Sequence, residues 1–193
     1  MYSIHNFGMN SETWNDLLAS VASDYEGFVP VSAAVAEGID RAWLIRLEQA
    51  GRLEREFHGV YRVPAWITSE RTKFVRAGLW LGQDGVIAGE SALEYWQLAD
   101  VNPREIQVRR FTGSRTRRHP PTAVNFLSPL KLRSLKADIH RDGRIPVLAP
   151  IDALFDAHRM NVSRRQLLLA TETAHSKGFV QTSEVEQLLD ALS

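Results

Sequence analysis

Residues 40–64 read DRAWLIRLEQAGRLEREFHGVYRVP, and this segment holds a helix pattern followed directly by a strand pattern. Asp40 is a typical helix N-cap, because its side chain can accept a hydrogen bond from a free N–H group of the first turn. Gly51 is a typical helix stop, because glycine adopts the left-handed conformation without strain. The segment therefore predicts a helix that runs from the Asp40 cap through Ala50.

This predicted helix has one face for packing and one face that is free. On a helical wheel the packing face carries Trp43, Leu44, Leu47 and Ala50. The opposite face, with Arg46 at its edge, carries Arg41, Ala42, Ile45 and Gln49. The face that does not pack is expected to meet solvent or a ligand.

A hairpin pattern follows the helix. Leu53–Phe57 and Val60–Val63 have the composition of strands and flank His58-Gly59, where glycine can provide the positive φ of a tight turn. Two helices are also predicted upstream, one capped by Ser11 and one over 31–37. Three helices followed by a β-hairpin is the order of a winged helix–turn–helix, whose third helix enters the major groove of DNA.

Six side chains of this helix and hairpin are candidates for DNA binding. Arginine suits guanine and glutamine suits adenine, because each can form two hydrogen bonds to one base edge. The candidates that we expect to reach base edges or phosphates from the free helix face are Arg41, Arg46 and Gln49. Those that we expect to hold phosphates are Arg52, Arg55 and Arg62. The alternative for each arginine is a surface ion pair, for which the nearby partners are Glu48, Glu54 and Glu56.

Basic residues concentrate in one later segment, although the net charge of the chain is zero. Residues 104–144 contain 11 Lys and Arg against 3 Asp and Glu, whereas residues 1–66 contain 5 against 9. Such a block predicts a surface that binds DNA or an acidic partner protein, and a solvated loop is the alternative. Its candidate residues are Arg109, Arg110, Arg115, Arg117, Arg118, Lys131, Arg133 and Lys136.

The second half of the chain predicts an α/β domain after a boundary within 65–69. Helices are predicted to begin at Ser69, Ser91, Pro150, Ser163 and Thr182. Strands are predicted over Val86–Ala88, Glu105–Arg109, Val124–Leu127, Ile139–His140 and Ile145–Leu148. We therefore predict an α+β fold: a winged helix–turn–helix at 1–66, then an α/β domain with a small central sheet and C-terminal helices at 67–193.

Signals for catalysis are weak. The chain has no cysteine, which excludes disulfides and thiolate chemistry, and no two of its 6 histidines show a short metal-binding spacing. Asp152 and Asp156 lie on one predicted helix and could pair as catalytic carboxylates, but a solvated helix side is the commoner arrangement. Gly89-Glu90-Ser91 lacks the closing glycine of a nucleophile elbow, so we interpret Ser91 as a helix cap. We expect no enzyme, no cofactor and no metal.

The sequence also bears on location. No apolar run approaches the ~20 residues of a membrane span. Residues 1–10 have neither the basic nor the apolar region of a signal peptide. We therefore expect a cytoplasmic protein without a membrane partner.

Three segments resemble the AbiEi family of antitoxins, the transcriptional regulators of type IV, AbiE-like toxin–antitoxin operons in bacteria. They are GRLEREFHGVYRVP at 51–64, SALEYWQL at 91–98 and IPVLAPIDALFD at 145–156. The resemblance implies a protein that binds inverted or direct repeats in its own promoter, self-associates on DNA and represses a two-gene operon. It also implies a nucleotidyltransferase-like toxin partner, which the C-terminal domain neutralises.

The resemblance places the DNA contacts of the family on the helix and hairpin residues named above. The family often has arginine at the positions of Ile45, Gln49 and Ala50, so weaker DNA binding through this domain is expected. Two alternatives stay open. One is a stand-alone winged-helix regulator whose C-terminal domain serves dimerisation or effector binding, and the other is an enzyme that processes nucleic acid.

Overall fold

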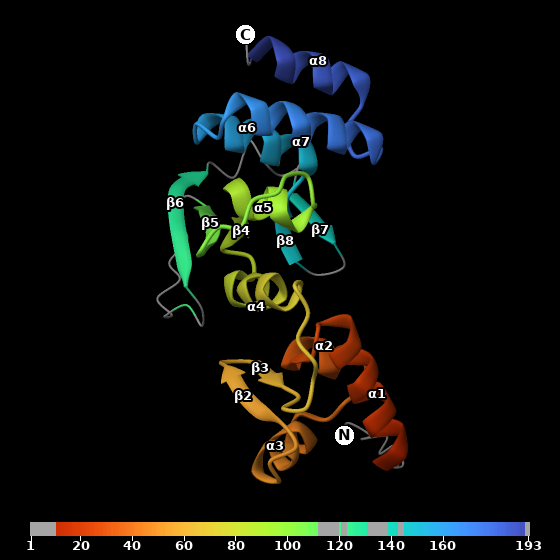
Figure 1. Ribbon diagram of the computed structural model, residues 1–193. Coiled ribbons are helices and arrows are strands. Elements are labelled where there is room, and N and C mark those ends of the chain that lie inside the picture. Colours follow the sequence, from red (N-terminus) through yellow and green to blue (C-terminus); the bar gives the residue numbers. More distant parts are fainter. Residues whose placement is uncertain (1–10, 112–119, 121–122, 131–138, 143–144, 192–193) are drawn as a thin grey trace, which may run out of the picture. The chain divides into compact units, whose positions relative to one another are not determined.

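The computed structural model describes residues 11–111, 120, 123–130, 139–142 and 145–191 (Figure 1). Its internal contacts divide the chain into two compact units, one ending at Thr72 and the other beginning at Lys73. Both units mix helices and strands, so the predicted α+β class is confirmed. No helix in the described part of the chain is long and apolar enough to cross a membrane.

The first unit is a winged helix–turn–helix. Its helices are α1 (Ser11–Asp24), α2 (Val31–Ala36) and α3 (Arg41–Gln49). Its strands are β1 (Phe28–Pro30), β2 (Glu54–Phe57) and β3 (Val60–Arg62). The strands form an antiparallel sheet in the order β1-β3-β2, so the hairpin predicted from sequence gains a third strand.

Local signals set the ends of α3 and of the hairpin. The Asp40 carboxylate accepts a hydrogen bond from the Ala42 N–H group at 3.0 Å, which confirms the predicted cap. Gly51 follows the helix with a φ of +69°, and Gly59 has a φ of +79° in the turn between β2 and β3. Both glycines therefore adopt the left-handed backbone conformation that the sequence predicts at these positions.

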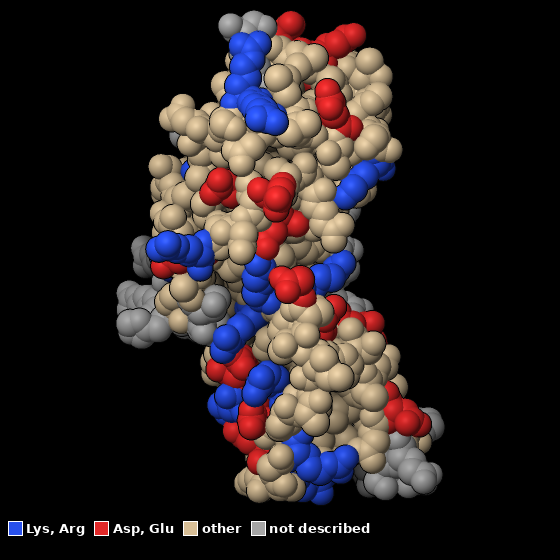
Figure 2. Space-filling view, in the orientation of Figure 1, with Lys and Arg blue, Asp and Glu red and all other residues tan. Residues whose placement is uncertain are grey.

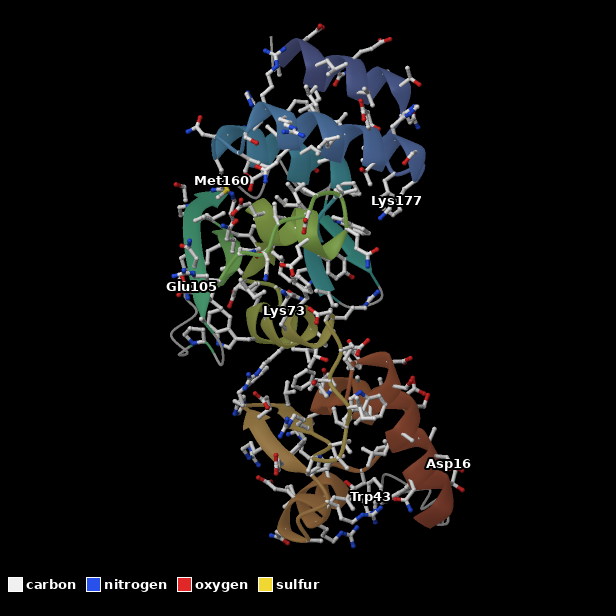
Figure 3. The ribbon with its side chains drawn as sticks, viewed as in Figure 1. Asp16, Trp43, Lys73, Glu105, Met160 and Lys177 are labelled. Atoms are coloured by element: carbon white, nitrogen blue, oxygen red, sulfur yellow. The ribbon has the colours of Figure 1, made fainter. Side chains whose placement is uncertain are left out.

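The inner face of α3 forms part of the core of this unit. Leu44 and Leu47 are buried, and the Trp43 ring meets the Trp14 ring of α1 edge-on, with centroids 5.1 Å apart. Figure 3 shows Trp43 on the side of α3 that faces α1. Ala50, which we predicted on the packing face, is instead exposed, because α3 ends one residue earlier and Ala50 is its C-cap.

The second unit is built around a five-stranded mixed sheet with the order β6-β5-β4-β8-β7. The strands are β4 (Gly85–Ile87), β5 (Ile106–Phe111), β6 (Val124–Leu130), β7 (Ile139–Asp142) and β8 (Ile145–Leu148). β4 pairs antiparallel with β5 and parallel with β8, and β7 and β8 form the predicted antiparallel pair. The neighbouring strands β4 and β8 lie in the core, since all seven of their residues are buried.

Five helices accompany this sheet: α4 (Thr72–Leu81), α5 (Gly89–Tyr95), α6 (Pro150–Arg159), α7 (Arg164–Ser176) and α8 (Thr182–Ala191). In Figure 1, α6 and α7 lie beyond α5, and α8 lies beyond them at the C-terminal end. Inward residues such as Leu154, Leu167 and Leu188 are buried between these helices. The predicted central sheet with C-terminal helices is confirmed.

The predicted starts of two helices are wrong. α4 begins at Thr72 rather than at Ser69, and α5 begins at Gly89 rather than at a Ser91 cap. Ser91 is fully buried inside α5, and its hydroxyl accepts a hydrogen bond from the Gln107 N–H group at 3.0 Å. Ser163, in contrast, caps α7 as predicted, because its Oγ accepts from the Gln166 N–H group at 3.3 Å.

Candidate nucleic-acid interface

The outer face of α3 is exposed along its whole length. The side chains on it are those of Arg41, Ala42, Ile45, Arg46 and Gln49. Leu44 and Leu47 fasten the opposite face to the core, so the exposed face is held in a fixed orientation. Within the described part of the chain, Arg41, Arg46 and Gln49 make no side-chain hydrogen bond or ion pair. Because all three side chains are exposed, they can reach a ligand.

Arg55 connects the hairpin to α3. Its Nε atom donates a hydrogen bond of 2.9 Å to the Oε1 atom of Glu48, and its Nη2 atom donates one of 2.9 Å to Oε2. Nη2 also donates to the Tyr61 hydroxyl at 3.1 Å, and the guanidinium carbon lies 5.2 Å from the centre of the Tyr61 ring. One arginine on β2 thus contacts α3 and β3 together, which holds the hairpin against the helix.

The charges of this cluster are stable around neutral pH. The hydrogen bond from Arg55 lowers the pKa of the Glu48 carboxyl, and the same bond raises the pKa of Arg55. Burial raises the pKa of the Tyr61 hydroxyl, so this group stays neutral. Glu48 therefore stays ionised and Arg55 stays cationic, and their ion pair persists across the physiological range.

The other two phosphate candidates also have partners in the first unit. Arg62 Nη2 lies 2.9 Å from an oxygen of Glu54, and its Nε lies 3.9 Å from Glu56. Arg52 donates a hydrogen bond of 3.1 Å to the Asn15 side chain. Figure 2 shows blue and red atoms side by side over the hairpin. Arg55 and Arg62 therefore form surface ion pairs in the protein without DNA, which is the alternative that the sequence left open for them.

A surface pocket of about 190 Å³ lies where α3 meets the hairpin. Its lining combines apolar, aromatic and cationic or donor groups: Val31, Arg41, Ile45, Arg55, His58, Gly59 and Tyr61. Sequence reasoning interpreted His58 only as a turn residue, and it did not identify Tyr61. The residues come together because the His58-Gly59 turn folds β3 back beside the exposed face of α3.

The predicted basic surface in the second unit needs correction. Arg109 is buried in β5, where its Nε lies 2.9 Å from Asp156 and its Nη1 donates to the Ser128 carbonyl at 2.7 Å. Arg110 is half-buried, and its guanidinium carbon lies 4.9 Å from the centre of the Phe126 ring. The remaining candidates lie outside the described residues: Arg115, Arg117, Arg118, Lys131, Arg133 and Lys136.

Asp156 is a structural residue of α6, and the expectation that it lies on a solvated helix side is wrong. Its carboxylate pairs with Arg109 and accepts a hydrogen bond of 3.0 Å from the Gly89 N–H group at the start of α5. A buried carboxylate with these partners joins α6, β5 and α5. Among the residues that the structure describes, no group of three His, Asp or Glu side chains could hold a metal ion.

Comparisons with known proteins bear on both units. Residues 16–64, which extend from within α1 past the end of β3, match the family model for transcriptional regulators of the AbiEi antitoxin type. The predicted resemblance is thereby confirmed, and the match covers the helices and hairpin described above. Among curated proteins no match was found.

A solved structure shares the fold. The RV2827C protein from Mycobacterium tuberculosis has 16% sequence identity to this chain and a TM-score of 0.51, over 92% of this chain and 71% of that one. The similarity therefore extends over both units. At this identity it concerns the arrangement of helices and strands, and the assignment of function rests on other observations.

Proposed function

We propose that this chain, whose first unit is a regulator domain of the AbiEi type, is a DNA-binding antitoxin that represses its own operon and neutralises a nucleotidyltransferase-like toxin. In this proposal residues 1–66 bind the promoter and residues 67–193 act on the toxin. The protein works in the cytoplasm, and several copies associate on repeated half-sites, since one winged helix covers a short stretch of DNA.

The exposed face of α3 carries the DNA-binding part of the proposal. It presents the exposed side chains of Arg41, Arg46 and Gln49 beside a hairpin whose turn lies next to the same face. These side chains match the donor and acceptor patterns of guanine and adenine in the major groove. The domain around them is of the type found in AbiEi transcriptional regulators.

The hairpin arginines take different parts. Arg62 and its partner Glu54 are 38% and 56% exposed, so their ion pair is weak and can be exchanged for a phosphate. Arg52 can likewise leave Asn15 for a phosphate, since its hydrogen bond is exposed. Arg55 is held by the two hydrogen bonds that it donates to Glu48 and therefore positions the hairpin. It would reach a phosphate only when DNA draws it from Glu48.

The experiment combines a promoter reporter with a toxicity assay in one host. Wild-type protein should repress a reporter under its own upstream DNA and restore growth when the neighbouring gene is expressed. Arg41→Ala/Arg46→Ala should abolish repression and leave the rescue of growth intact, because neutralisation is assigned to the second unit. Arg164→Ala/Arg165→Ala is a matched control, since it removes two exposed arginines from α7.

The stand-alone regulator is the second candidate, and the exposed α3 face supports it equally. It predicts repression without any rescue of growth, and a neighbouring gene that does not encode a nucleotidyltransferase-type protein. If wild-type protein neither repressed the reporter nor restored growth, both candidate functions would be contradicted.

A further inference from the structure

We propose that Ile45 and Ala42 contact the C5-methyl groups of thymine, so that α3 reads an apolar feature of the operator beside its hydrogen-bonded bases. This inference rests on the proposed DNA binding by α3. It assigns a recognition role to a position where the AbiEi resemblance leads one to expect arginine.

Ile45 differs from the leucines of its own helix. Its side chain is 40% exposed, whereas Leu44 and Leu47 on the same helix are at most 5% exposed. It lies one helical turn from Arg41 on one side and one turn from Gln49 on the other, so the three form a row along the free face. An apolar residue thus occupies the middle of the surface that is directed at DNA.

Ala42 extends the apolar surface. It is exposed and lies three residues before Ile45, hence next to it on the helix, and it lies four residues before Arg46. The two aliphatic side chains are therefore bordered by hydrogen-bond donors. Neither can bind a phosphate or pair with a charge, so the gain on binding DNA must come from burying methyl groups.

The major groove offers one group that suits such a surface. Thymine presents a C5-methyl group beside its O4 acceptor, whereas cytosine presents an N4 amino group and has no methyl. When a thymine methyl group packs on Ile45, the methyl group and the Ile45 side chain both lose contact with water. Each such contact should therefore favour thymine over a base without the methyl by about fourfold, as expected for burying one methyl group.

The pocket between α3 and the hairpin supports the same placement. Ile45 lines it together with Val31, and the remaining lining includes Arg41, Arg55 and His58. Apolar and cationic or donor groups thus meet in one recess. A thymine methyl on Ile45 would have its neighbouring backbone phosphate next to groups that can bind an anion.

The test is a double-mutant cycle between protein and DNA methyl groups. Fluorescence anisotropy would measure wild type, Ile45→Ala and Val35→Ala on the protein's upstream duplex, prepared with thymidine or with deoxyuridine, which lacks only the methyl. Wild type should bind the deoxyuridine duplex about fourfold more weakly for each methyl contacted. Ile45→Ala should lose affinity for the thymidine duplex and show a smaller difference between the two duplexes. Val35→Ala, which trims a 49% exposed valine of α2, should keep the full wild-type difference.

Two outcomes would overturn the inference. Equal affinity of wild type for both duplexes would show that no thymine methyl is contacted. A difference that is the same in wild type and Ile45→Ala would show that Ile45 contacts no thymine methyl, and would assign the effect to other contacts or to DNA shape. Either result leaves the proposed function intact if wild type still prefers its upstream duplex over a shuffled one. Loss of that preference would overturn the proposed function and this inference together.

Discussion

Replacing Asp156 by asparagine should destabilise the second unit, because the change removes one charge from a buried ion pair. The Asp156 side chain is 3% exposed and lies 2.9 Å from the Nε of Arg109, whose side chain is 10% exposed. The same carboxylate accepts a hydrogen bond from the Gly89 N–H group. Asp156→Asn therefore leaves a guanidinium inside the protein without its counterion.

The expected magnitude follows from these contacts. Removing one partner of a buried ion pair costs about 3–5 kcal/mol, mostly because the other charge is left uncompensated. Asparagine keeps a side-chain oxygen that can still accept from Gly89, so we expect the lower end, about 3 kcal/mol in the free energy of unfolding. For a unit of this size that corresponds to a Tm lower by about 10 °C.

Differential scanning calorimetry of the full chain would measure the loss, and hydrogen exchange read by mass spectrometry would locate it. Protection should fall in β5, α5 and α6 and stay unchanged in the first unit. Asp190→Asn is a matched control, since Asp190 is exposed on α8. A loss below about 1 kcal/mol, or equal losses in Asp156→Asn and Asp190→Asn, would refute the assignment of Asp156 as a structural residue.

Two further predictions concern Gly89 and Glu48. Gly89→Ala should lower the Tm more than Gly51→Ala. Both glycines have a positive φ, but a Cβ at Gly89 would overlap the Gln107 Oε1 atom, whereas Gly51 faces open space. Equal melting temperatures of the two variants by circular dichroism would contradict this. An NMR titration should place the pKa of Glu48 below that of an ordinary glutamate, and Arg55→Ala should raise it. The stabilisation from the Glu48–Arg55 pair is therefore present above the ordinary glutamate pKa and is lost as the pH falls through the lowered pKa. A titration midpoint of Glu48 equal to that of an ordinary glutamate would contradict this prediction.

The elements that sequence patterns predicted well are those with local signals. Asp40, Gly51 and Gly59 act within a few residues of themselves, so the α3 helix and the hairpin could be derived from the printed letters. The exposed face of α3 followed from helical periodicity for the same reason. β1 could not be derived this way, because it is three residues long and is defined by its pairing with β3.

Partners distant in the sequence account for the errors. The basic neighbours of Arg109 in the sequence predict a basic surface, but Arg109 is buried and pairs with Asp156, 47 positions further on. The local pattern predicts Ser91 as a helix cap, yet the first N–H group of α5 donates its hydrogen bond to Asp156 of another helix. The sequence offers Glu48 as an ion-pair partner for the hairpin arginines. The hydrogen bond from Arg55 to Tyr61, in contrast, depends on the register of β2 and β3.

The central claim, that α3 reads the operator, is tested most directly by fluorescence anisotropy on the protein's own upstream DNA. The measurement would compare this duplex with a shuffled one over a salt series, for wild type, Arg41→Ala/Arg46→Ala and the control Arg164→Ala/Arg165→Ala. We predict that wild type and the control prefer the upstream duplex, and that Arg41→Ala/Arg46→Ala loses this preference, with each lost base contact costing about 1–3 kcal/mol. A preference for the upstream duplex that survives Arg41→Ala/Arg46→Ala would contradict the claim.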